Sequence, residues 1–175
     1  ILDSCKDELG DEFKMYAVNT LSQCQFFPEQ VFRINLDKMN EKLENRLNKR
    51  DIKPTAMRIL VLQYLTEQTK AVSLNDIETE FERADKSTLF RTLKTFEESK
   101  LIHSIEDGTG HLKYALCLEG CSCSPIDLHY HFHCNKCKET FCLTTLSIPY
   151  IELPKNFEMQ QANMVIKGIC ANCKI

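Results

Sequence analysis

The chain has 175 residues, of which 43% are hydrophobic, so it is long enough for one domain or for two small ones with packed cores. No apolar run approaches the roughly 18 residues that a membrane-spanning helix needs, so we expect no membrane partner. The formal net charge of −3 does not by itself indicate nucleic-acid binding. Residues 38–100, with 13 basic and 11 acidic side chains, form the only net basic segment. Any DNA affinity is therefore expected to come from local placement of charge and from dimerisation.

The first 38 residues are acidic and have no clear hydrophobic repeat, so we expect an N-terminal extension and assign it no function. From Asn40 onward the pattern becomes helical, with Leu43 and Leu47 spaced four apart. A second helix is expected to begin at Pro54 and to end near 67–69. Ser73, with an acidic residue three positions later, predicts the N-terminus of a third helix.

A fourth helix is expected to be capped by Asp85 or Ser87 and to bury Leu89, Leu93 and Phe96 on one face. After Lys100 the period changes. The pattern predicts a strand over 101–105, a turn over 107–110 and a second strand over 111–116. Helices followed by a β-hairpin are the order of a winged helix-turn-helix domain.

In a winged helix the last helix enters the major groove of DNA. Hydroxyls and cations can contact phosphates, and an arginine can form two hydrogen bonds with guanine. The alternative is an ordinary amphipathic helix with a solvated charged face. On the exposed face of this helix we expect Lys86, Ser87, Thr88, Arg91, Thr92 and Lys94.

Two Cys-x-x-Cys pairs lie in the C-terminal third of the chain. They are Cys134 with Cys137, and Cys170 with Cys173. Together they can supply the four thiolates of a structural zinc site. The 32 residues between the pairs exceed the usual zinc-ribbon spacing, so a sheet that brings the pairs together fits better than a small knuckle. Disulfides are the weaker interpretation, because no signal peptide is visible and we expect a reducing, cytoplasmic location.

A run of alternating histidines precedes the first pair. Residues on one strand alternate between its two faces, so His129, His131 and His133 can share a face. A closed thiolate site beside a histidine-rich strand indicates two metals, one that holds the fold and one that is sensed.

The chain resembles the ferric uptake regulator (Fur) family of metal-responsive repressors over about 39–173. The resemblance implies a winged helix joined by a hinge to an α/β dimerisation domain, and a homodimer that binds a palindromic operator in double-stranded DNA when metal is loaded. Phe90 stands where the family has a tyrosine at the DNA face, which removes a hydroxyl but leaves contact with a thymine methyl possible. The motifs that carry the resemblance are Pro54-Thr55-x-x-Arg58, Ser87-Thr88-Leu89-Phe90-Arg91-Thr92-Leu93, His129-x-His131-x-x-Cys134-x-x-Cys137 and Cys170-x-x-Cys173.

The resemblance also shows where the regulatory site departs from the family pattern. Leu128 and Tyr130 interrupt the usual His-His-Asp-His run, and Cys142 stands where a glutamate is expected. A histidine expected before the third helix is replaced by Lys70 or Ala71. The tentative regulatory ligands are His111 on the wing, Cys123 (or Cys121) in the hinge, His129, His131 and Cys142.

A mixed set of histidines and cysteines favours zinc, whereas oxygen-rich octahedral sites suit iron or manganese. We therefore predict a metal-dependent transcriptional repressor that senses Zn²⁺, with Fe²⁺ or Mn²⁺ as the other candidate ions. A thiol-redox sensor on the same fold and a zinc-stabilised interaction module without DNA binding remain alternatives. The chain has no H-E-x-x-H motif and no glycine-rich phosphate loop, so we do not expect an enzyme.

Three further side chains receive structural interpretations. His103 is expected to be a surface or half-buried residue of the wing, His133 to flank the zinc site, and Cys117 to be a small apolar core residue. The fold class expected is α+β, with a winged helix-turn-helix domain followed by a small α/β dimerisation domain that contains a structural zinc site. The predicted divisions are an extension over 1–38, the DNA-binding domain over 39–116, a hinge over 117–127 and the dimerisation domain over 128–175.

Overall fold

The structure is a computed structural model that describes residues 29–118, 120, 128–149, 152–159 and 162–174. The chain divides into two compact units, residues 1–41 and 42–175. No helix among the described residues is long and apolar enough to cross a membrane. Most of the predicted hinge lies outside the described residues.

The first helix, α2 (Glu29–Asn48), begins well before the predicted start at Asn40. No glycine or proline interrupts the sequence between Glu29 and Asn48, so the helix can extend upstream of Asn40. Its start could not be predicted, because this stretch has no clear amphipathic repeat. Its last two turns belong to the second unit, where Leu43 and Leu47 are buried in the core.

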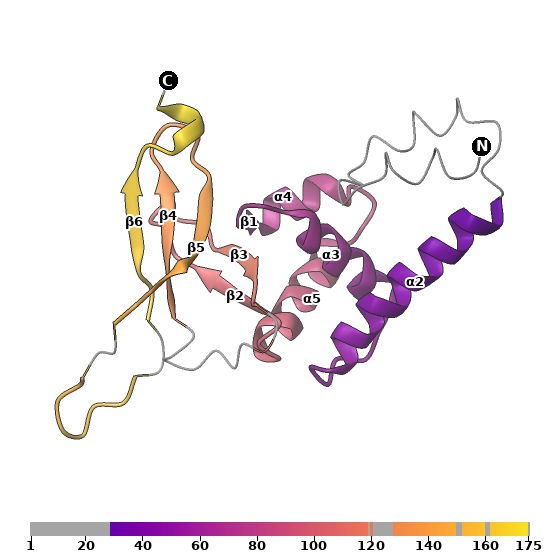
Figure 1. The fold of residues 1–175 in the computed structure, drawn as a ribbon, viewed down its shortest axis with the longest axis horizontal. Coiled ribbons are helices and arrows are strands. Elements are labelled where there is room, and N and C mark those ends of the chain that lie inside the picture. The colour runs from indigo at the N-terminus through magenta and orange to yellow at the C-terminus, as the bar shows by residue number, and fades with distance from the viewer. Residues whose placement is uncertain (1–28, 119, 121–127, 150–151, 160–161, 175) are drawn as a thin grey trace, which may run out of the picture. The chain divides into compact units, whose positions relative to one another are not determined.

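Three further helices, α3 (Ala56–Glu67), α4 (Leu74–Glu80) and α5 (Lys86–Glu98), confirm the predicted helical order (Figure 1). The helix α3 is capped by Thr55, so Pro54 lies just before the cap and not in the first turn. A capping box at the start of α4 and a side-chain cap from Asp85 at the start of α5 were both predicted from the sequence. The predicted stripe of Leu89, Leu93 and Phe96 is buried in the core between α3, α4 and α5.

A three-stranded antiparallel sheet completes the winged helix. Its strands are β1 (Val72–Ser73), β2 (Ile102–Ile105) and β3 (Lys113–Leu116), in the order β1-β3-β2. The second strand of the hairpin is shorter than predicted, because Gly108 and Gly110 adopt positive φ angles and residues 108–111 form bends. The two-residue strand β1 was not predicted, since two residues are too short to show a period.

The C-terminal module contains a second three-stranded sheet of β4 (His129–Cys134), β5 (Thr140–Ser147) and β6 (Val165–Gly168), in the order β5-β4-β6. The pair β4–β5 is antiparallel and β4–β6 is parallel. A single 3₁₀ turn, η2 (Ala171–Cys173), follows β6. The α+β class is confirmed, and the described part of the C-terminal module contains these three strands and one 3₁₀ turn but no α-helix.

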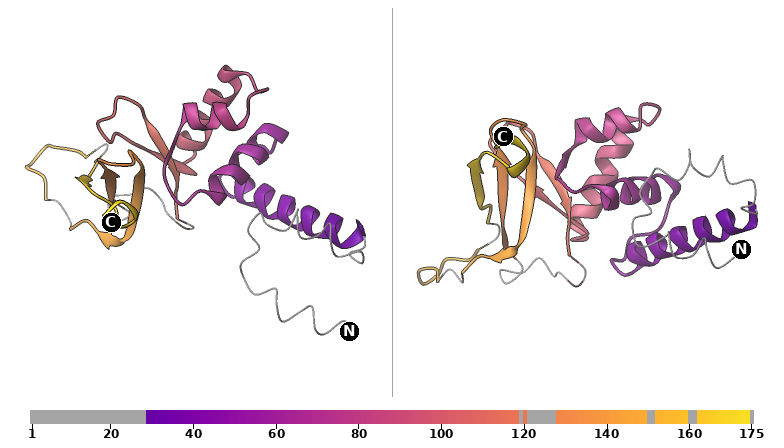
Figure 2. Two further views of the ribbon diagram at one scale, coloured as in Figure 1. Left: turned by 90° about the horizontal axis from the view of Figure 1, so that it is seen from above. Right: turned by 45° about the horizontal axis from the view of Figure 1, so that its top comes forward.

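Within the second unit the wing sheet lies next to the C-terminal sheet (Figures 1 and 2). The backbone N–H of Ala71 donates to the carbonyl of Thr140 at 2.8 Å. The hydroxyl of Thr140 donates to Asp107 Oδ2 at 2.6 Å, and His133 Nδ1 lies 3.0 Å from the same hydroxyl. Asp107, Thr140 and His133 are all buried, and Lys70 forms an ion pair with Glu139 beside them. These contacts hold the wing turn against strands β4 and β5.

Candidate metal centres

The four cysteines of the two Cys-x-x-Cys pairs gather at one end of the C-terminal sheet. Cys134 ends β4, Cys137 lies in the turn that follows, and Cys170 and Cys173 come after β6. The parallel pairing of β4 with β6 brings the two pairs together, so that the four Sγ atoms all lie within 4.8 Å of one another. Such a set matches the closed tetrahedral thiolate shell of a structural zinc site.

The electrostatics of this cluster favour a cation at its centre. The backbone N–H of Cys170 donates to Cys134 Sγ at 3.3 Å, and this hydrogen bond, with those from the backbone of Cys137 and Lys136, lowers the pKa of Cys134 to about 6. The hydrogen bond with the Cys170 thiol, then burial and the other thiols, raise the pKa of Cys173 to about 12. Four crowded thiols cannot all ionise beside one another unless a cation offsets their charge, and a divalent ion would bind all four as thiolates.

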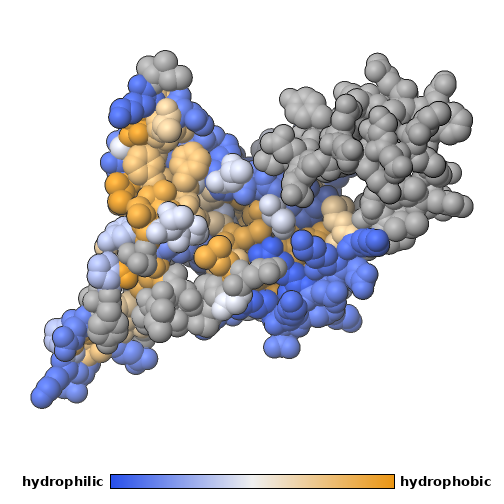
Figure 3. Space-filling model, in the orientation of Figure 1, coloured by the Kyte–Doolittle hydropathy of each residue, from blue (hydrophilic) through white to orange (hydrophobic). Residues whose placement is uncertain are grey.

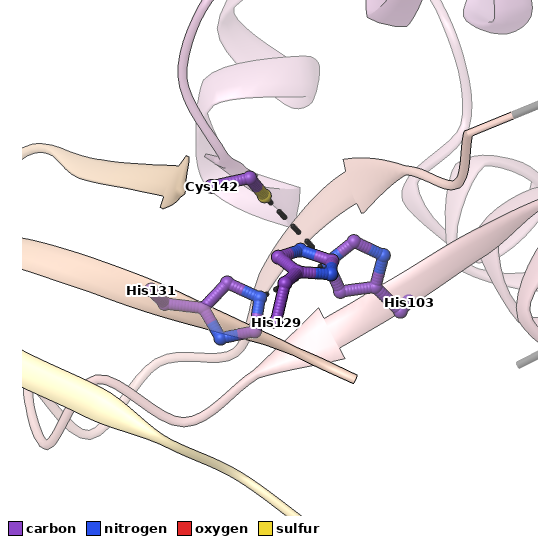
Figure 4. Close-up of side chains that lie close together, drawn as sticks. All are labelled: His103, His129, His131 and Cys142. Carbon is purple, nitrogen blue, oxygen red and sulfur yellow. Dashed lines mark hydrogen bonds between the residues drawn. The ribbon is translucent and has the colours of Figure 1, made fainter. Parts of the chain in front are cut away.

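A second cluster brings together His103 from β2, His129 and His131 from β4, and Cys142 from β5 (Figure 4). One ligand atom from each of the four lies within 4.8 Å of the others. His131 and Cys142 are direct partners in the β4–β5 register, and the register shifts between His129 and Tyr130. We call these four residues the histidine–cysteine cluster.

His103 contacts two other members of the cluster through one of its ring nitrogens. Its Nε2 lies 3.2 Å from His131 Nε2 and 3.6 Å from Cys142 Sγ. Its Nδ1 lies 3.5 Å from the sulfur of the buried Cys117. A contact at one ring nitrogen orients the other, and here it directs Nε2 toward the cluster.

The cluster is suited to a metal ion because burial keeps two of its imidazoles, those of His103 and His131, neutral. Burial, followed by the neighbouring histidines, lowers the pKa of His103 to about 4. Burial and then His129 lower the pKa of His131 to about 4. Burial raises the pKa of the Cys142 thiol to about 11, so this sulfur would lose its proton only when a cation binds. Three nitrogens and one sulfur can then provide a tetrahedral set.

The structure brings together three of the five tentative regulatory residues, His129, His131 and Cys142. His111 is exposed in the wing turn and lies outside the cluster, because the second strand of the wing begins only at Lys113. Cys123 and Cys121 lie outside the described residues.

The sequence interpretation missed His103, which was expected to be only a residue of the wing. The one signal in the sequence is its place between Ile102 and Ile105, both buried, on a strand of the predicted hairpin. His133 shares the strand with the cluster, but its Nδ1 contacts Thr140 and, at 3.3 Å, Asp107.

The helix α5 presents most of its predicted face to solvent. Arg91 is exposed and donates from Nε to the Ser87 carbonyl at 3.2 Å, so its guanidinium lies along the helix. Phe90 is 49% exposed despite its apolar ring. The expectation for Thr92 was wrong: it is buried and its hydroxyl donates to the Thr88 carbonyl. Lys86, Ser87 and Lys94 are exposed, and Thr88 is half-buried.

Comparison with known proteins gives a family match. The profile of the Ferric uptake regulator family matches residues 49–167. Among solved structures, a zinc uptake regulator complexed with zinc and DNA has 19% sequence identity and a TM-score of 0.55, covering 78% of this chain and 93% of that one. The ferric uptake regulator Fur of Vibrio cholerae has 15% identity and a TM-score of 0.50, covering 73% of this chain and 98% of that one. No curated protein matches the chain.

At these identities the solved structures establish a shared fold, and the family profile covers more than half of the sequence. The family consists of transcription regulators and not of enzymes, as the sequence predicted. The chain belongs to the ferric uptake regulator family of metal-responsive transcriptional regulators.

Proposed function

We propose that this protein is a zinc-sensing repressor that binds a palindromic DNA operator as a homodimer when its histidine–cysteine cluster is loaded. The observation that supports this most strongly is the origin of the four ligands. His103 comes from the wing of the DNA-binding domain, whereas His129, His131 and Cys142 come from the C-terminal sheet. One ion bound to all four would join the two parts of the protein.

The donor set is the reason for choosing zinc. It contains three imidazole nitrogens and one sulfur, and no carboxylate oxygen. Zinc accepts nitrogen and sulfur in a tetrahedral site, whereas manganese prefers more oxygen ligands and non-haem iron centres commonly include a carboxylate. A disulfide switch between Cys142 and Cys117 has less support, because their sulfurs contact different ring nitrogens of His103.

Metal binding would act on DNA binding through geometry. Fixing the wing against the C-terminal sheet fixes the orientation of α5, and in a dimer this sets the spacing of the two recognition helices. Because binding free energies are reciprocal, zinc and operator would each tighten the binding of the other by the same factor.

The exposed face of α5 supports the DNA partner. Arg91 could form two hydrogen bonds with a guanine, and Phe90 could contact a thymine methyl. Neighbouring cations and hydroxyls would contact phosphates. These phosphate contacts would come from Lys86, Ser87, Thr88 and Lys94.

The C-terminal sheet supports the homodimer. Leu146, Ile166 and Ile169 are each between 43% and 49% exposed, and the hydrophobic surface gathers over the region of β4–β6 in Figure 3. Apolar surface of this kind is commonly covered by a second subunit.

A DNA-binding measurement tests the proposal. Duplexes would first be selected from a random pool with zinc-loaded protein, and their affinity would then be measured with Zn²⁺, Fe²⁺, Mn²⁺, or chelator plus reductant. We expect zinc to tighten binding about 5–150-fold, the usual range of coupling between two sites.

Each other outcome overturns a defined part of the proposal. A response to iron or manganese alone would contradict the choice of zinc. Binding restored by reductant in the presence of chelator would indicate a thiol switch. No salt-dependent affinity for duplex DNA would indicate a zinc-stabilised interaction module.

A further inference from the structure

A cavity of about 970 Å³ lies between the N-terminal ends of α4 and α5, the wing turn and the C-terminal sheet. Four lysines line it: Lys86 from α5, Lys113 from the wing, and Lys138 and Lys167 from the C-terminal module. We call it the lysine groove. It is distinct from both cysteine-containing clusters.

The charge of the groove is positive because its lining contains only one carboxyl group, that of Asp107. This side chain is 1% exposed and accepts hydrogen bonds from Thr109 and Thr140, so it is already engaged. Two of the lysines are also partly neutralised, since Lys86 pairs with Glu78 and Lys113 with Asp76.

The two lysines of the C-terminal module differ from these. Among the described residues, neither Lys138 nor Lys167 forms an ion pair with a carboxylate. The ammonium of Lys167 lies directly over the wing turn, because a methyl group added at Gly108 would be only 2.5 Å from Lys167 Nζ. Lys138 is exposed in the turn after Cys137, where its φ angle is 63°.

The groove is continuous with the face of α5 that would read DNA. Lys86 and Phe90 belong to the exposed face of that helix and also line the groove. A duplex held by α5 and the wing would therefore bring its phosphate backbone past the opening. Phosphates are the anions that lysines contact in such complexes.

We propose that Lys138 and Lys167 bind the phosphate backbone of the operator, so that the C-terminal module contacts DNA directly as well as dimerising. This rests on the proposed DNA-binding function and extends its footprint. Because Lys138 directly follows Cys137 in the connection between β4 and β5, the four-cysteine cluster would also position a phosphate contact.

The test is the salt dependence of duplex binding for the double variant Lys138→Gln/Lys167→Gln. Each lost phosphate contact lowers the slope of log K against log salt by about 0.9, so we expect a fall of about 1.8 per protomer. The affinity near 0.15 M salt should drop by about an order of magnitude or more, equally for all duplex sequences. Lys155→Gln is the matched control, an exposed lysine of the same module that does not line the groove, and it should leave the slope unchanged.

Lys167→Gln alone separates the loss of charge from damage to the cysteine cluster, because Lys167 lies on β6 with its ammonium beside Gly108 of the wing turn, whereas Lys138 directly follows Cys137. It should lower the slope by about 0.9 per protomer. A double variant with the wild-type slope and affinity would overturn the proposed contact while leaving the DNA-binding function in place. If the wild-type protein itself shows no salt-dependent DNA affinity, the failure lies with the proposed function.

Discussion

Replacing Cys170 with serine is expected to remove one tightly held zinc ion and to unfold the C-terminal sheet. Cys170 holds the cluster in two ways. Its backbone N–H donates to Cys134 Sγ at 3.3 Å, and its own sulfur lies 3.8 Å from Cys137 Sγ. Serine is a poor zinc ligand, so the variant would retain three thiolates and an incomplete shell.

The expected loss of stability is large, because the free energy of zinc binding is comparable with the free energy of unfolding of a whole domain. A structural zinc site contributes about 10–16 kcal/mol of binding free energy in small zinc domains, whereas a whole domain is stable by only about 5–15 kcal/mol. The strand β6 has only four residues paired with β4, so we expect its position to depend on the metal. Elemental analysis and thermal unfolding followed by far-UV circular dichroism would measure both consequences.

Cys142→Ser is the matched control, since it makes the same substitution in the histidine–cysteine cluster. It should keep one zinc ion per chain and an intact fold. A Cys170→Ser protein that retained its full zinc content and melted like the wild type would show that the four-cysteine cluster is not a structural zinc site.

Replacing His103 with alanine is expected to abolish the response of DNA binding to zinc while preserving the fold. His103 is the one member of the cluster that comes from the wing sheet, so its loss would disconnect the metal from the DNA-binding domain. The neighbouring Ile102 and Ile105 remain in the core and hold β2 in place. The ratio of affinities with and without zinc should fall from about 5–150-fold to near one.

The control for this variant is His111→Ala, which removes an exposed histidine of the same hairpin that lies outside the cluster. It should leave the zinc response unchanged. If instead His103→Ala kept a full response and His111→Ala lost it, the ligand from the wing would be His111, as the sequence alone suggested.

How far the sequence predicts the fold depends on the element. The helices α3, α4 and α5 were all predicted, α4 from its capping box and α5 from its cap and buried stripe, whereas the start of α3 was placed at Pro54 and not after the Thr55 cap. The strand β1 has only two residues and is defined by its pairing with β3, which no local pattern reveals. The start of α2 was placed too late, because the sequence between Glu29 and Asn40 has no clear amphipathic repeat.

The same distinction applies to the metal centres. The four cysteines could be grouped from spacing alone, because each pair is local and thiolates in two pairs imply a common ion. His103 could not be assigned to its cluster from spacing, because the other three members lie 26 or more residues away in the sequence and on another sheet. Its membership depends on how the wing packs against β4 and β5, through contacts such as Thr140 with Asp107. Contacts between distant segments of this kind leave no periodic signal in a single sequence.

The most direct test of a metal that joins the wing to the C-terminal sheet is the metal content of the purified protein before and after mild chelation, measured together with DNA affinity. The account predicts two zinc ions per chain, of which one is removed by the chelator, and a loss of DNA affinity in step with that removal. A single zinc ion per chain, with DNA affinity that does not change on chelation, would contradict it.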